Sequence, residues 1–91
     1  MSQVTVYVTN YCPYCNAAEK FLRDHAVPFE RVDVTHDPAM RQRLVELTGM
    51  RTVPQVFVGE RSVGGYTDML GLHRRGELEP LLEDVGLTLG A

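Results

Sequence analysis

The sequence has few cysteines, no long apolar run and no basic cluster, and these absences exclude several classes of protein. Nine Lys and Arg stand against twelve Asp and Glu, and adjacent basic residues occur only as Arg74-Arg75. The chain therefore lacks an electrostatic footprint for nucleic acid. No stretch approaches the roughly eighteen apolar residues of a membrane-spanning helix, and residues 1–5 have neither a basic start nor an apolar export core. We expect a cytoplasmic protein that binds neither nucleic acid nor membranes.

The length and composition predict a single domain. A chain of 91 residues is enough for one compact domain and too short for two. With 44% hydrophobic and 23% charged residues, it has the composition of an ordinary globular protein. No repeat, linker or low-complexity segment divides it. We therefore expect residues 1–91 to fold as one domain, and the protein to be a monomer.

The only two cysteines are Cys12 and Cys15, in a Cys-Pro-Tyr-Cys run. A structural disulfide between them would close a loop of about 4 residues, worth about 2 kcal/mol, and would connect no distant parts of the fold. A zinc site needs four ligands, and the three histidines lack the paired spacing that would complete one. We expect no metal site within one chain. The explanation that remains for the two cysteines is dithiol redox chemistry.

The residues around the cysteines assign a role to each sulfur. Pro13 suits the first position of a helix, which makes Cys12 the N-cap and turns its sulfur toward the free N–H groups of Tyr14 and Cys15. Those donors and the helix dipole favour a thiolate. Cys15 and Leu22 fall on the apolar face of this helix, so the second sulfur should lie against the core. Cys12 is predicted to attack and Cys15 to resolve.

The rest of the chain alternates short strands with helices. The expected elements are a strand at 4–8, a helix at 13–25, a strand at 29–34, a helix at 38–48, a hairpin of strands at 55–58 and 61–63, and helices at 67–75 and 77–85. Met40, Leu44 and Leu47 share one face of the helix at 38–48. The order β-α-β-α-β-β-α, followed by a short last helix, combines a parallel unit with an antiparallel hairpin in one sheet.

Three motifs in this order resemble the dithiol glutaredoxins of the bacterial Cys-Pro-Tyr-Cys type. They are Cys-Pro-Tyr-Cys at 12–15, Thr-Val-Pro-Gln at 52–55 and Gly-Gly-Tyr-Thr-Asp at 64–68. The resemblance covers nearly the whole chain and implies an α/β, thioredoxin-like fold, a mixed four-stranded sheet with helices on both faces. It implies a glutathione-dependent thiol–disulfide oxidoreductase without a permanently bound cofactor. Cys12 alone would reduce glutathione mixed disulfides, and Cys12 with Cys15 would reduce protein disulfides, with ribonucleotide reductase as a candidate partner.

The resemblance also implies a groove for glutathione. A cis peptide before Pro54 would bring the backbone of Val53 opposite the sulfurs, where its N–H and C=O pair with the cysteinyl part of glutathione. Thr52 would flank the same groove, and Gly65 would allow close approach of the ligand.

At the far side of this groove, the N–H groups of Tyr66, Thr67 and Asp68 at a helix start would bind the γ-glutamyl carboxylate. The Asp68 side chain would accept a hydrogen bond from the γ-glutamyl ammonium. A simple first-turn acid is the competing interpretation of Asp68.

The glycine carboxylate of glutathione needs a cation or a strong donor. The resemblance gives this role to Arg41, for which a solvated surface arginine is the alternative, and it places Tyr14 at the same end of the groove. Arg51 is a weaker candidate. The chain departs from the family where a lysine commonly stands three residues before the first cysteine, because it has Thr9 there. Glutathione affinity and the identity of the small thiol therefore stay open.

Three alternatives remain at this point. The first is a redoxin that uses another low-molecular-weight thiol with the same cysteines. The second is an iron–sulfur carrier, in which two chains share a cluster through Cys12 and two glutathione molecules, because one chain lacks four thiolates. Pro13 counts against the carrier, since cluster-binding relatives more often have a small or polar residue there. The third is a binding module whose disulfide is only a switch.

Overall fold

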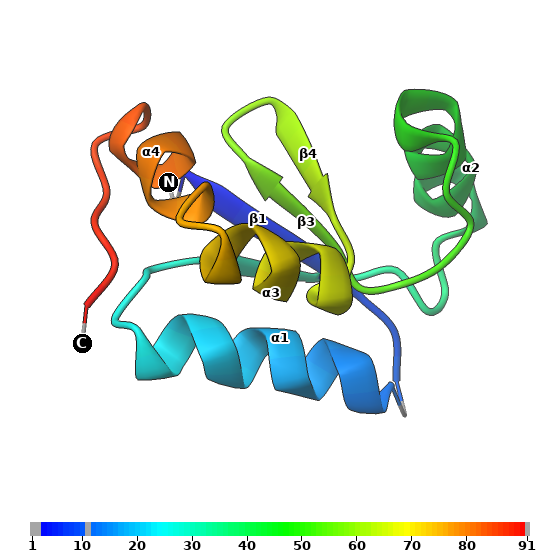
Figure 1. Cartoon of the computed structure of the whole chain (residues 1–91). Coiled ribbons are helices and arrows are strands. Elements are labelled where there is room, and N and C mark those ends of the chain that lie inside the picture. The colour runs from blue at the N-terminus through cyan, green and yellow to red at the C-terminus, as the bar shows by residue number, and fades with distance from the viewer. Residues whose placement is uncertain (1–2, 11, 91) are drawn as a thin grey trace.

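A four-stranded sheet forms the centre of the molecule (Figure 1). The computed structural model describes residues 3–10 and 12–90. The elements in chain order are β1 (Val4–Val8), α1 (Pro13–Asp24), β2 (Glu30–Asp33), α2 (Pro38–Thr48), β3 (Gln55–Val58), β4 (Arg61–Gly64), α3 (Tyr66–Arg74) and α4 (Leu78–Glu83). The strands lie in the order β2-β1-β3-β4, with β1 parallel to β2 and β3 antiparallel to both β1 and β4. The predicted mixed sheet is confirmed, and the element boundaries differ from those expected by at most two residues.

The alternation of side chains along β1 decides which face of the sheet carries the main core. Val4, Val6 and Val8 are fully buried and belong to one hydrophobic cluster with residues of α1, α3 and α4. Each such valine contributes roughly 1.5 to 3 kcal/mol through burial. Leu22 of α1 and Met69 of α3 fill the same cluster. This core fixes α1 and α3 against one face of the sheet (Figure 1).

Helix α2 lies on the opposite face and covers it only in part. The Asp37 carboxylate accepts a hydrogen bond from the N–H of Met40 at 3.0 Å, and Gly49 ends the helix with a φ of 76°. Leu44 is buried, but Leu47 is 60% exposed and borders a shallow hollow over the sheet. The expected apolar stripe of this helix therefore has only Leu44 fully inserted, because α2 stands at one end of the sheet (Figure 1).

The end of the chain returns to the carboxyl end of α1. The N–H of Gly90 donates to the carbonyl oxygen of His25 at 2.6 Å, and the carbonyl oxygen of Gly90 lies 2.9 Å from Nδ1 of the same histidine. The imidazole also packs on Phe21 and lies near His73. These contacts tie the last described residues to α1. Within residues 3–10 and 12–90, no helix has the length and apolar character needed to cross a membrane.

Candidate active site

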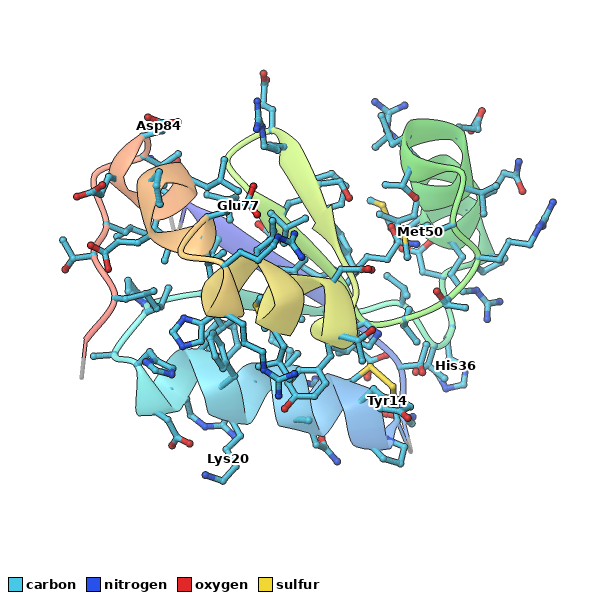
Figure 2. All side chains as sticks on the ribbon, viewed as in Figure 1. Tyr14, Lys20, His36, Met50, Glu77 and Asp84 are labelled. Carbon is cyan, nitrogen blue, oxygen red and sulfur yellow. A yellow bond between two sulfur atoms is a disulfide. The ribbon has the colours of Figure 1, made fainter. Side chains whose placement is uncertain are left out.

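Cys12 and Cys15 form a disulfide at the amino end of α1, beside Tyr14 (Figure 2). Their Cα atoms are 5.1 Å apart. Cys15 is 1% exposed and belongs to the core cluster, whereas Cys12 is partly exposed at its edge. An incoming nucleophile or disulfide can therefore reach the sulfur of Cys12 more easily than that of Cys15, as the helical spacing predicted.

Cys12 is the N-cap of α1, and Pro13 occupies the first turn. The backbone N–H of Cys15 donates a hydrogen bond to Sγ of Cys12 at 3.2 Å, so one of the two expected donors makes this contact. The first turn of α1 carries no acidic residue that would oppose a negative sulfur. After reduction, this N–H and the positive end of the helix dipole stabilise the Cys12 thiolate.

This arrangement predicts a lowered pKa for the Cys12 thiol. We expect its pKa to lie well below the roughly 8.5 of a free cysteine. The measurement is the alkylation rate of Cys12 against pH in a Cys15→Ser variant, in which only one thiol can react. If the alkylation rate rose with pH around the pKa of an ordinary thiol, about 8.5, the capping argument would be contradicted.

The loop before β3 faces these sulfurs. The peptide bond between Val53 and Pro54 is cis, as the family resemblance implied. The carbonyl oxygen of Val53 lies 3.7 Å from Sγ of Cys12. A backbone segment with its own donor and acceptor therefore stands beside the more accessible sulfur, where an extended ligand can pair with it.

A groove of about 350 Å³ begins at this loop and passes in front of α3. We call it the active-site groove; its lining residues are Tyr14, Met50, Thr52, Val53, Pro54, Gly65, Tyr66, Thr67 and Asp68. All of the residues expected to bind glutathione line it except the two arginines, because Arg51, the weaker candidate, is not among the lining residues. Arg41, the main candidate for the glycine carboxylate, lies exposed in α2 and is not among the lining residues either. Met50 was missed, because nothing in its local sequence marks a methionine before the Thr-Val-Pro run as a ligand contact.

Asp68 has a structural role at the start of α3. Its Oδ2 accepts a hydrogen bond from the N–H of Gly65 at 2.9 Å, which caps the helix. A carboxylate can accept several hydrogen bonds, so this contact leaves acceptor capacity toward the groove. At Gly65, a Cβ atom would make an ordinary van der Waals contact with the carbonyl oxygen of Pro54, at 3.4 Å, so the glycine backbone and the wall of the groove lie close together here.

Gln55 fixes the loop that carries Val53. It is 1% exposed at the start of β3, and its Nε2 donates to the carbonyl oxygens of Met50 at 2.9 Å and Thr52 at 3.0 Å. Its Oε1 lies 3.1 Å from the hydroxyl of Thr48, which in turn accepts from the N–H of Met50 at 3.0 Å. One buried amide thus satisfies the two loop carbonyls on either side of Arg51, and so holds the wall of the groove in place.

A second set of hydrogen bonds holds the segment that leads to Cys12. The N–H of Asn10 donates to the hydroxyl oxygen of Thr35 at 2.8 Å, and the N–H of Thr35 donates to the Asp33 carboxylate at 2.8 Å. Hydrogen bonds from Thr35 keep the pKa of the Asp33 carboxyl below its ordinary value. Asp33 ends β2, so the sheet positions the approach to the redox pair.

Two cysteines three residues apart at a helix start, facing a cis-proline loop on a mixed sheet, define a thiol–disulfide oxidoreductase of thioredoxin-like fold. The family model described as Glutaredoxin matches residues 4–63, more than half of the chain. The chain belongs to the glutaredoxin family.

Similar proteins of known identity agree with this assignment. Glutaredoxin 3 of Escherichia coli (strain K12) is 35% identical over 83 residues, which cover 91% of this chain and 100% of that protein. A glutaredoxin of Pseudomonas aeruginosa is 39% identical over 82 residues, covering 90% and 98%. The crystal structure of a buckwheat glutaredoxin–glutathione complex superimposes with a TM-score of 0.88 at 29% identity, covering 99% of this chain and 83% of that one. The resemblance read from the three motifs is confirmed.

Proposed function

We propose that the protein reduces disulfides with glutathione as the electron donor. The observation that carries this proposal is the active-site groove, which passes the Val53 backbone, whose carbonyl oxygen is 3.7 Å from the Cys12 sulfur, and reaches the start of α3. The similar buckwheat protein was solved in complex with glutathione. In the proposed binding mode the cysteinyl part of glutathione pairs with Val53, and its γ-glutamyl end meets Thr67 and Asp68.

In the first reaction, the Cys12 thiolate attacks the glutathione sulfur of a mixed disulfide. The bond between the two substrate sulfurs breaks, and the substrate leaves as a thiolate that takes a proton from water. A second glutathione thiolate then attacks the glutathione sulfur bound to Cys12, which forms oxidised glutathione and releases the Cys12 thiolate. A low pKa favours this last step, because a more acidic thiol is a better leaving group.

In the second reaction, Cys12 attacks a protein disulfide and forms a mixed disulfide with it. The Cys15 thiolate then attacks Sγ of Cys12, the protein substrate leaves with both sulfurs reduced, and the disulfide seen in this structure forms. Two glutathione molecules reduce that disulfide and become one molecule of oxidised glutathione. The 5.1 Å separation of the two Cα atoms lets Cys15 close the bond without moving α1.

The direct test is a coupled assay with glutathione, glutathione reductase and NADPH, with a small glutathione mixed disulfide as substrate. Parallel reactions replace glutathione by other low-molecular-weight thiols, each with a reductase for its own disulfide. We expect turnover with glutathione. Turnover with another thiol and none with glutathione would overturn the proposed donor, and Thr9, in place of the family's lysine, would then be the first residue to examine.

Arg41 remains our candidate for a long-range contact to the glycine carboxylate. Because it is exposed and does not line the groove, its contribution should be that of a screened surface charge. We expect Arg41→Ala to raise the glutathione KM by about two- to fivefold and to leave kcat unchanged. Steady-state kinetics at low and high salt measure this, with Arg43→Ala on the same helix as control. Equal effects of both variants would assign the change to overall charge.

We further propose that residues 1–91 form a single domain that acts as a monomer in the cytoplasm. The shared core of β1, β3, α1, α3 and α4 supports one domain. A compartment that keeps thiols reduced suits a protein whose cycle begins from two free thiols. Its protein substrates would be disulfide-containing proteins, with ribonucleotide reductase as one candidate.

A further inference from the structure

A second groove, of about 430 Å³, lies between β4 and α3. Arg61 and Ser62 of β4 form one wall, and Gly71 and Arg75 line the opposite side. We call this the α3–β4 groove. None of these four residues belongs to the active-site groove or to the redox pair.

The two grooves adjoin each other. Thr67 and Asp68 line both of them. In addition, β4 ends at Gly64, and the next residue, Gly65, lines the active-site groove. A ligand that runs along the active-site groove toward Asp68 therefore reaches residues that also border the α3–β4 groove.

The surface of α3 is shaped to leave this second groove open. Thr67, Gly71 and Arg75 follow one another at four-residue spacing and so form a stripe along one side of the helix. Glycine in a helix interior is destabilising relative to alanine. At position 71 a Cβ atom would lie 3.3 Å from Nη1 of Arg75, so the missing side chain gives the guanidinium room to lie across the helix.

The charges in the α3–β4 groove favour an acidic ligand. Arg61 is exposed and makes no ion pair with any residue that the structure describes. The Nε of Arg75 pairs with Glu77, and the remaining guanidinium N–H groups are available to a second carboxylate. The one acid in the lining, Asp68, stands at the end shared with the active-site groove, where it caps α3.

We propose that the α3–β4 groove binds the acidic segment that flanks the reactive cysteine of a protein disulfide substrate. This inference rests on the proposed function, in which glutathione ends at Asp68 through its γ-glutamyl group. A protein substrate has no such end, so its chain continues past Asp68 and places Asp or Glu side chains beside Arg61 and Arg75. The α3–β4 groove thus favours protein disulfides with acidic neighbours and does not affect small glutathione mixed disulfides.

The test uses two synthetic peptides, each closed by one disulfide. In one the cysteines are flanked by Asp and Glu, and in the other by Asn and Gln. We expect the reduced protein to reduce the acidic peptide with a kcat/KM about two- to fivefold higher for each arginine engaged, with the preference falling as salt rises. Arg61→Gln and Arg75→Gln should each lower this preference, and Glu77→Gln, which releases Arg75, should increase it.

Two further variants control the experiment. Arg74→Gln removes a neighbouring exposed charge that does not line the α3–β4 groove, and should leave the preference intact. Gly71→Met should fill the groove and slow reduction of both peptides, with thermal unfolding checking that the variant is folded. Equal rates for the two peptides, or an equal loss in Arg74→Gln, would overturn the inference. Turnover of a small glutathione mixed disulfide, measured alongside, reports separately on the proposed function.

Discussion

Cys12→Ser is expected to abolish reduction of both mixed disulfides and protein disulfides, whereas Cys15→Ser should abolish only the second. Both reactions begin with attack by the sulfur at the helix N-cap, which is the more accessible of the two. Reduction of a glutathione mixed disulfide needs only that sulfur and a second glutathione. Cys15 is buried and is needed only to displace a protein substrate from Cys12.

The measurement is initial rates of the wild-type protein and both serine variants, with a small glutathione mixed disulfide and with a protein disulfide. The Cys15→Ser variant should retain the first activity within about threefold of wild type, and mass spectrometry should find glutathione bound to Cys12 as the trapped intermediate. If both variants lost the mixed-disulfide reaction equally, Cys15 would have a role beyond resolution.

Gln55→Leu is expected to lower the free energy of unfolding by about 2 to 4 kcal/mol and also to raise the glutathione KM. The leucine removes both donors from the carbonyl oxygens of Met50 and Thr52, which face a buried position. A buried acceptor left without a partner costs about 1 to 3 kcal/mol. The loop that carries Val53 should then move, and the groove should recognise glutathione less well.

Chemical denaturation gives the stability change, and steady-state kinetics give KM and kcat separately. Gln42→Leu is the matched control, because it makes the same substitution at an exposed position of α2. Gln55→Glu keeps the size of the side chain but replaces its two N–H donors by at most one O–H donor, and should reproduce the KM effect in part. A Gln55→Leu variant of normal KM would show that the loop holds its conformation without the amide.

The sequence was sufficient for the elements whose ends carry strong local signals. Asp37 marks the start of α2 and Gly49 its end, because a side-chain cap and a left-handed glycine act on the nearest backbone atoms. The alternating burial of Val4, Val6 and Val8 follows from the two-residue period of a strand. Local chemistry also placed Cys12 at the N-cap of α1.

Contacts that depend on the path of a loop could not be predicted in this way. The sequence marked Gln55 only as the last residue of the Thr-Val-Pro-Gln motif and gave it no role. Its hydrogen bonds to Met50 and Thr52 depend on how the loop folds back to the start of β3. The exposure of Leu47 likewise depends on where α2 stands over the sheet, which helical periodicity does not determine.

The contact between Gly90 and His25 determines the tautomer of that imidazole. A carbonyl oxygen can only accept, so its hydrogen bond to Nδ1 requires the proton to be on Nδ1. Neutral His25 is therefore the Nδ1–H form, with the lone pair on Nε2. The attachment of the chain end to α1 therefore uses the Nδ1 side of the ring and leaves Nε2 as a hydrogen-bond acceptor.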